Sequence, residues 1–149
     1  MGVIGDDGDQ DCTSRVNKVR RNHPGVEALL KTVKDRGNQL SYMVIYLSPG
    51  DYHRFHSPAI HTARFRRHIA GYLSPVKPSY VKNHRDVFKN NERVNIFGDW
   101  FGTDRLFFFL SYVGALNVGS IKLDFDNDVL TNQVMPKDPY LFDKAYVKD

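Results

Sequence analysis

Cysteine is nearly absent from this sequence, since Cys12 is the only one in 149 residues. A single thiol excludes a disulfide framework and a zinc site built from several thiolates. No apolar run approaches the roughly 18 to 20 residues that a membrane-spanning helix requires. The acidic residues near the start (Asp6, Asp7, Asp9 and Asp11) are unlike an acid-poor leader, so no targeting segment is visible. Any membrane contact of this chain is therefore expected to be peripheral.

The sequence also lacks a dense stripe of Lys and Arg interleaved with stacking aromatics, which argues against a nucleic-acid partner. What it does have is a net charge of +4 with the histidines neutral. That excess is compatible with an anionic membrane surface or an anionic substrate. Aromatic residues are abundant, and the length suits one domain with a sizeable core.

The composition divides the chain into three parts. Residues 1–24 have few apolar side chains and predict a disordered arm. Residues 25–131 hold the periodic segments and predict the folded domain. Residues 132–149 are polar, contain Pro136 and Pro139, and predict an irregular tail.

Periodicity predicts the elements of the domain. Apolar spacing from Pro24 to Gly37 is typical of a short amphipathic helix. Apolar or alternating runs predict extended segments at 40–48, 60–65, 69–73, 93–97, 106–113 and 117–125. A weak turn is expected at Gly98-Asp99, and one or two helical turns are expected within 79–88. The expected fold is mainly β (α+β), a sandwich or barrel-like antiparallel sheet with one or two short helices.

A polar cluster follows the first of these strands. Pro49-Gly50 ends the apolar run as a turn, and Asp51, His53, Arg54 and His56 come within the next six residues. Such a cluster is either an ordinary solvated loop or an active site. A metal hydrolase using Asp51, His53 and His56, with His61 or His68 as a further ligand, is a third reading, but nothing in the sequence supplies second-shell support, so no metal site is expected.

A second unusual stretch runs from Tyr112 to Ile121 and contains Gly114 and Gly119. Glycines inside a β-prone run mark a bulge, a tight bend or the close approach of another backbone or a ligand. A bent strand at a corner of the sheet explains them as well as a ligand site does.

Five sequence pieces occur in a fixed order: the stretch from Val44 to Pro58, Arg66-Arg67-His68, Asn91-Glu92-Arg93-Val94, Gly98-Asp99-Trp100 and the stretch from Val113 to Ile121. This series closely resembles the phosphatidylserine decarboxylase family, especially its mitochondrial form, over about residues 40–131. The Asp-Tyr-His-Arg-Phe-His-Ser-Pro stretch is the specific piece, and the others agree with it in order and spacing.

The resemblance implies a self-processing, pyruvoyl-dependent carboxy-lyase. In that family a serine-protease-like arrangement cuts the proenzyme before a serine in a Leu-Gly-Ser-Thr-type motif, and this serine becomes the pyruvoyl group of a short α chain. The pyruvoyl group forms a Schiff base with phosphatidylserine and accepts the electrons released as CO2 leaves, which gives phosphatidylethanolamine. The resemblance also implies peripheral association with the mitochondrial inner membrane.

Carried over by position, His56 matches the charge-relay base that activates the cleavage serine. An imidazole suits this task because its unperturbed pKa lies near 6.5. His53 matches the residue implicated in decarboxylation, as an acid or base. Asp51 and Arg54 are expected to be structural.

Two parts of the family pattern do not occur in this sequence. The relay aspartate normally stands in a Pro-Ala-Asp-Gly-like context, and Asp7-Gly8 does not match it. The Leu-Gly-Ser-Thr-type motif is absent, and Ser120 corresponds to an internal Val-Gly-Ser stretch rather than the processing site. The hypothesis is therefore a β-chain fragment that needs a missing α-chain segment and is inactive alone. The alternative is a non-catalytic lipid- or protein-binding remnant.

Overall fold

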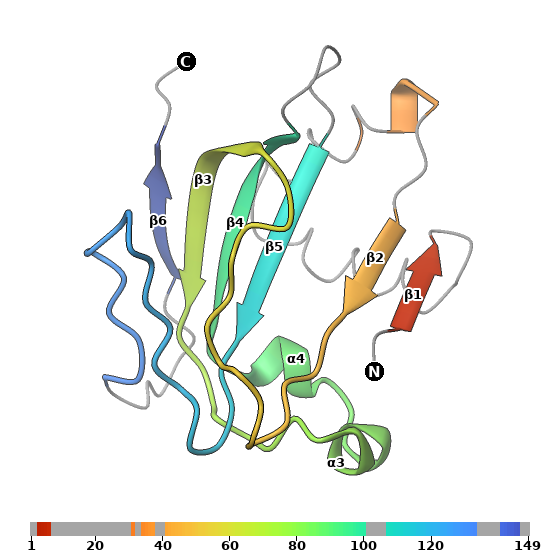
Figure 1. Cartoon of the computed structure of the whole chain (residues 1–149), viewed down its shortest axis with the longest axis vertical. Helices are drawn as coiled ribbons and strands as arrows, with labels where there is room; N and C mark the ends of the chain where they lie inside the picture. The colour runs from red at the N-terminus through yellow and green to blue at the C-terminus, as the bar shows by residue number, and fades with distance from the viewer. Residues whose placement is uncertain are drawn as a thin grey trace. The chain divides into compact units, whose positions relative to one another are not determined.

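The computed structural model describes residues 3–6, 31, 34–37, 41–100, 107–133 and 141–146, with the backbone alone at 3–6. The chain divides into two compact units, residues 1–53 and 54–149. Each unit has its own sheet (Figure 1).

The first unit contains an antiparallel pair of strands, β1 (Val3–Asp6) and β2 (Ser41–Val44). The expectation of a disordered arm over residues 1–24 is wrong at β1, and residues 7–24 lie outside the described part of the chain. β2 ends before the predicted boundary at residue 48, because residues 45–48 have no ladder partner among the described residues.

The predicted helix ending at Gly37 is described only near its end. Lys31, Lys34 and Asp35 are helical, and the amide of Gly37 donates to the carbonyl of Lys34 at 2.9 Å. Gly37 has φ 70°, the left-handed conformation that glycine adopts without a Cβ penalty. The predicted helix end is therefore confirmed, while its apolar positions at 26, 29, 30 and 33 lie outside the described residues.

The second unit is a four-stranded antiparallel sheet with the strand order β5-β4-β3-β6 (Figure 1). The strands are β3 (His61–Ile69), β4 (Arg93–Trp100), β5 (Phe107–Val113) and β6 (Leu141–Ala145). Two short helices, α3 (Pro78–Asn83) and α4 (Val87–Asn90), lie in the connection between β3 and β4. The mainly β prediction is confirmed, and the described sheet is open at β5 and β6 rather than closed into a barrel.

The core lies on one face of this sheet. Val94 and Ile96 of β4 are buried there against Ile121, Leu123 and Val129 of the segment that follows β5, and Leu110 and Tyr112 of β5 pack against this cluster. Alternation along β4 and β5 places these side chains on the same face. The long segment after β5 therefore covers one side of the sheet.

The prediction of a strand at 117–125 is wrong, although its alternating pattern is real. Ile121 and Leu123 are buried and Lys122 is exposed, but the segment forms only isolated bridges instead of a ladder. The Thr131 hydroxyl donates to the Ile121 carbonyl at 3.2 Å and accepts from the Ile121 amide at 2.7 Å. A side chain thus satisfies the backbone groups that a neighbouring strand would otherwise satisfy.

Two further predictions in this region need correction. Residues 60–65 and 69–73 do not form two extended runs, because β3 continues from His61 to Ile69 as one strand. Gly98 is not a turn residue but lies inside β4. It faces an irregularity of β3 between Ala63 and Phe65, and a Cβ there would lie 2.0 Å from the Thr62 carbonyl oxygen. Glycine is needed at this position for close backbone approach.

The glycines at 114 and 119 make room for one side chain. A Cβ at Gly114 would lie 2.9 Å from Leu73 Cδ2, and a Cβ at Gly119 would lie 2.6 Å from Leu73 Cδ1. The tight bend expected here is observed as the turn between Ala115 and Val118, and the group that approaches both glycines is the side chain of Leu73 rather than another backbone or a ligand.

The expectation of an irregular tail over 132–149 is wrong at Leu141–Ala145, which form β6 and pair with β3 from Ile69 to Phe65. β6 alternates little in burial, and its inner contacts are ionic. A hydrophobic pattern therefore could not reveal it.

Asn91 stabilises the turns at one end of the sheet. Its side chain is fully buried, donates to the carbonyls of Ser74 at 2.8 Å and Gly114 at 2.9 Å, and accepts from the Ser74 amide at 3.1 Å. Asn91→Ala leaves these backbone groups unsatisfied, so we expect the free energy of unfolding to fall by about 2–4 kcal/mol in urea denaturation. The control Asn90→Ala removes an exposed amide and should change it by less than about 0.5 kcal/mol. Equal effects of the two variants would contradict this role.

Candidate active site

The candidate loop begins with a closed turn. The amide of Asp51 donates to the Ser48 carbonyl at 2.8 Å, and Asp51 Oδ2 accepts from the Ser48 amide at 2.7 Å. The backbone hydrogen bond from Ser48 lowers the pKa of Asp51 below its ordinary value of 3.8. The Asp51 side chain therefore holds the turn, in agreement with the structural role expected for it.

His53 is exposed and has one ring nitrogen fixed. Its Nδ1 lies 2.6 Å from the carbonyl oxygen of Asp51. A carbonyl only accepts, so Nδ1 carries the proton and donates it. In the neutral ring, Nε2 is then the basic nitrogen. The loop backbone thus sets the tautomer of this imidazole.

His56 belongs to the second unit, whose sheet anchors the residue before it. The ring of Phe55 stacks on Tyr112 of β5 with 3.6 Å between centroids and 18° between planes. Burial raises the pKa of Tyr112 to about 12, so the phenol stays neutral. His56 itself is exposed. The aromatic stack therefore fixes the backbone beside an accessible imidazole.

A short hydrogen-bonded turn connects this loop to β3. The Ser57 hydroxyl donates to the Ala59 carbonyl, and Nδ1 of His61 lies 2.9 Å from Ser57 Oγ. Since the serine hydrogen is already used, His61 Nδ1 donates to Ser57. His61 also packs its ring against Phe108 at 4.8 Å.

The described residues hold no group of three or more His, Cys, Asp and Glu side chains arranged to bind a metal ion. His61 and His68, the two further ligands considered for a metal hydrolase, lie seven residues apart on β3, a separation of about 23 Å. His68 is buried and engaged by Glu92.

Ser120 is exposed in the segment after β5. The glycine before it is explained by its packing against Leu73. Asp7, the nearest imitation of a relay aspartate, lies outside the described part of the chain.

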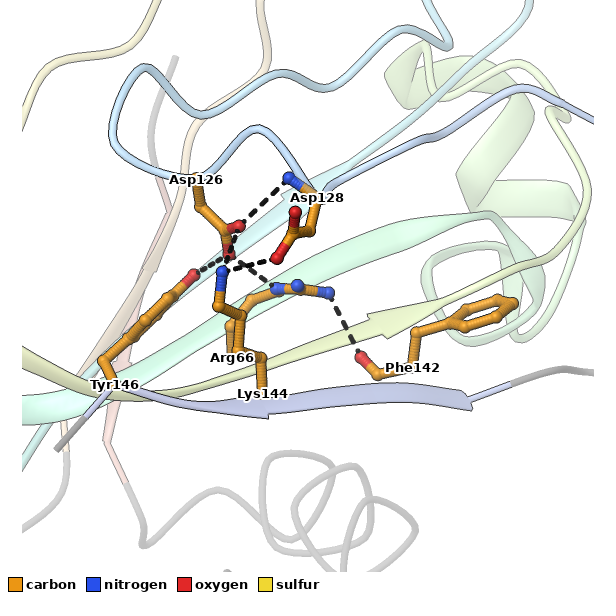
Figure 2. A network of polar contacts seen from close by, with 6 residues as sticks. All are labelled: Arg66, Asp126, Asp128, Phe142, Lys144 and Tyr146. Carbon is orange, nitrogen blue, oxygen red and sulfur yellow. Dashed lines mark hydrogen bonds and ion pairs between the residues drawn. The ribbon is translucent and has the colours of Figure 1, made fainter. Parts of the chain in front are cut away.

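Sequence reasoning missed a buried ionic network in the second unit. Figure 2 shows the Asp126 carboxylate among Arg66, Lys144 and Tyr146. Arg66 Nε donates to Asp126 Oδ2 at 3.1 Å, Lys144 Nζ donates to Oδ1 at 2.9 Å, and the Tyr146 hydroxyl donates to Oδ2. The side chain of Asp126 is completely buried and that of Arg66 is 4% exposed. The network joins β3, β6 and the segment that covers the core.

The network shifts the pKa values of its members. Burial alone would raise the pKa of Asp126, but the hydrogen bonds from Lys144, Tyr146 and the Asp128 amide, with the charge of Arg66, lower it to about 2. Burial and the hydrogen bond to Asp126 raise the pKa of Tyr146 to about 12. Hydrogen bonds to Asp126 and Asp128 raise the pKa of Lys144. Asp126 is therefore an anion at neutral pH.

Two further pairs stabilise β3. Arg67 forms a fork with Asp143 of β6, with Nε–Oδ1 and NH2–Oδ2 distances of 2.8 and 2.7 Å. His68 Nε2 lies 2.8 Å from Glu92 Oε1, and Glu92 Oε2 accepts from the Asn132 amide at 2.9 Å. The Arg66-Arg67-His68 run was recognised as a motif piece, but a strand pattern does not predict that all three side chains are buried with acidic partners.

The family model described as phosphatidylserine decarboxylase matches residues 11–140. The chain belongs to the phosphatidylserine decarboxylase family. Among its relatives, the mitochondrial phosphatidylserine decarboxylase proenzyme of Rattus norvegicus is 49% identical over 100 residues, which are 67% of this chain and 24% of the relative. Proenzyme 1 of Saccharomyces cerevisiae is 47% identical over 100 residues, or 66% of this chain and 19% of the relative. That of Arabidopsis thaliana is 46% identical over 98 residues, or 66% and 21%.

The chain thus spans about a quarter or less of the length of the curated phosphatidylserine decarboxylase proenzymes that it matches. No solved structure matches it. The resemblance inferred from the ordered sequence pieces is confirmed, and it places the chain in a carboxy-lyase family. In the described ranges, no helix is long and apolar enough to cross a membrane.

Proposed function

We propose that this chain supplies the two-histidine part of a pyruvoyl-dependent phosphatidylserine decarboxylase. The observation that carries the proposal is the family match over residues 11–140, which encloses the Asp-Tyr-His-Arg-Phe-His-Ser-Pro loop. The substrate would be phosphatidylserine and the products phosphatidylethanolamine and CO2. A segment with the Leu-Gly-Ser-Thr-type serine would act as the partner, and the chain alone would be inactive because its sequence lacks that motif.

The side chains of the candidate loop fit the proton-transfer part of this chemistry. The pyruvoyl group, when present, supplies the electron sink for decarboxylation. The loop contributes two exposed imidazoles, and imidazole is the side-chain group best suited to take or give a proton near neutral pH. It contributes no electron sink, which agrees with a cofactor formed on another segment.

We assign different tasks to the two histidines. His56 would act as the base for the serine that is processed, and the stack of Phe55 on Tyr112 supports this by fixing the neighbouring backbone. His53 would hold or move a proton during decarboxylation. Its Nδ1–H is fixed by the Asp51 carbonyl, which leaves Nε2 as the nitrogen for proton transfer.

The proposed location follows from the names of the relatives. Those of Rattus norvegicus, Saccharomyces cerevisiae and Arabidopsis thaliana are mitochondrial. We infer that this chain acts in mitochondria, at the surface of the inner membrane, where it would meet phosphatidylserine.

Reconstitution tests the proposal. We expect co-expression with a complementary segment, which carries the Leu-Gly-Ser-Thr-type motif and the upstream relay-aspartate segment, to restore cleavage before the serine and release of CO2 from phosphatidylserine. Mass spectrometry of the new amino terminus and a CO2 assay provide the two measurements. The control is the same pair with the motif serine replaced by alanine, which should remain uncut.

A stable complex that neither processes nor decarboxylates would contradict the proposal and favour a non-catalytic lipid- or protein-binding remnant. If no complex forms, a single-chain chimera repeats the test. In it, residues 40–131 replace the matching region of the rat proenzyme, and the unaltered rat proenzyme is run in parallel.

A further inference from the structure

One end of the four-stranded sheet collects several loops. The register places Ile69 of β3, Arg93 of β4 and Val113 of β5 side by side. The connection 70–92, with α3 and α4, and the turn that follows β5 therefore project from the same end (Figure 1). We call this region the α3–α4 end.

Apolar side chains are exposed at the α3–α4 end. Tyr72, Leu116 and Val118 are 58%, 59% and 43% exposed. Leu116 stands in the two-residue turn between Ala115 and Val118, which exchange two backbone hydrogen bonds of 2.9 Å, and Asn117 has φ 66°. Polar residues and glycine usually occupy such positions, so an exposed leucine in the turn is unusual.

The two loops that carry these side chains are packed against each other. Leu73 fills the space over Gly114 and Gly119, and the buried Asn91 links Ser74 to Gly114. The exposed apolar groups are therefore presented on two loops that are fixed to each other.

The same end is positively charged. The connection 70–92 contains four Lys and Arg residues, Asp86 and the buried Glu92, a net charge of +2. The four cations, all exposed, are Lys77, Lys82, Arg85 and Lys89. Arg93 is not one of them, because its guanidinium donates to the carbonyls of Lys89 and Asn91 at the end of α4.

The candidate loop reaches this end too. Phe55 stacks on Tyr112, the residue before the last one of β5, and His56 follows it. Tyr112 pairs with Val94, next to Arg93. The Phe55 ring, one residue before the proposed processing base, is therefore held near the end of β5 from which the α3–α4 end projects.

We propose that the α3–α4 end docks on the surface of an anionic phospholipid bilayer. Exposed leucine, valine and tyrosine would enter the headgroup region, while flexible lysine and arginine side chains would contact the lipid phosphates. This combination favours a lipid surface over an acidic protein, since an acidic protein would pair with the cations but would not require apolar side chains to be exposed on the same end. The inference rests on the proposed function in one respect only, namely that the proposed substrate is a membrane lipid.

Vesicle binding by the full chain tests the charges. We expect binding to phosphatidylcholine vesicles that contain phosphatidylserine or phosphatidylglycerol, little binding to pure phosphatidylcholine, and weakening by salt. Lys82→Gln/Lys89→Gln should lower the partition coefficient by roughly fivefold per charge removed. The control is Lys122→Gln, which removes an exposed cation of the segment after β5, outside the residues that define the α3–α4 end, and should lower the partition coefficient less than Lys82→Gln or Lys89→Gln alone.

A fluorescent reporter tests the apolar contact. In a Trp100→Phe background, Leu116→Trp should shift to the blue and be quenched by brominated lipid when anionic vesicles are added. Ile60→Trp is the control, because Ile60 is 74% exposed just before β3, at the opposite end of the sheet. The tryptophan introduced at position 60 should stay exposed, so its fluorescence should still be quenched by a water-soluble quencher.

Equal binding by both charge variants, or equal quenching at both tryptophans, would overturn the docking surface. Equal binding to pure phosphatidylcholine and to anionic vesicles would also overturn it, because the charge of the lipid would then play no part. Vesicle binding needs no processing. A chain that docks as expected but fails reconstitution would refute the proposed function alone, and the reverse result would refute the docking surface alone.

Discussion

Replacing His56 by alanine in the reconstituted enzyme is expected to abolish self-processing within the time that the unaltered pair needs for completion. A positioned general base contributes typically about 10²- to 10⁴-fold to the rate of such a step. The substitution removes an exposed side chain and leaves the stack of Phe55 on Tyr112 in place, so the loop should keep its position. The fraction cleaved over time, measured by gel electrophoresis, reports the effect.

His53→Ala separates the two tasks. Processing should continue at close to the normal rate, while CO2 release from the processed enzyme should fall by about 10²-fold or more, because the proton donor or acceptor is lost. The Ser48–Asp51 turn does not use the imidazole and should persist. A control is Lys122→Gln, which alters an exposed side chain of the segment after β5 and should affect neither step. Cleavage by the His56 variant, or arrest of cleavage in the His53 variant, would refute the assignment.

Asp126→Asn is expected to lower the free energy of unfolding by about 3–5 kcal/mol, since it leaves the buried charge of Arg66 without its counter-ion. Asp128→Asn is the matched control. Asp128 also binds Lys144, at 2.7 Å, but its side chain is 72% exposed, so the loss should be less than about 1 kcal/mol. Urea denaturation at neutral pH measures both, and similar losses would contradict the importance of burial.

The dependence of the free energy of unfolding on pH, measured in acid, gives a second test of the same network. The pKa of Asp126 is lowered from 3.8 to about 2, so its ionised form stabilises the fold above pH 4. This contribution should be lost as the pH falls from about 4 through about 2. Asp126→Asn should therefore flatten the dependence of stability on pH in that window, whereas Asp128→Asn should leave it unchanged.

Local patterns predicted the elements whose burial follows a simple period. The strands at 93–97 and 106–113 and the helix end at Gly37 were predictable because alternation, apolar content and a left-handed glycine are written in neighbouring residues. Leu141–Ala145 was not predictable. Its partners on β3 are charged, and a strand stabilised by Asp143 and Lys144 looks like a polar tail.

The candidate site, like the fold, was predictable from the sequence only in part. The order of the sequence pieces was enough to recognise the family and to select His53 and His56. It could not show that the Asp51 carboxylate accepts a hydrogen bond from the Ser48 amide, or that the glycines at 114 and 119 accommodate Leu73. These facts depend on contacts between residues distant in sequence or on the conformation of a single turn, which periodicity does not encode.

The strand β6 is joined to β3 by residues far apart in the chain, with Arg67 and Asp143 separated by 76 positions. During synthesis on the ribosome, the two buried arginines of β3, Arg66 and Arg67, therefore emerge long before Asp126 and Asp143, the acids that neutralise them. A growing chain that has reached only β5 would have to bury two cations without counter-charges, which costs several kcal/mol for each ion. Closing so long a loop is also slow compared with forming a local hairpin. We therefore expect the pairing of β4 with β5 to form early and β3 to join the sheet only after β6 has been synthesised.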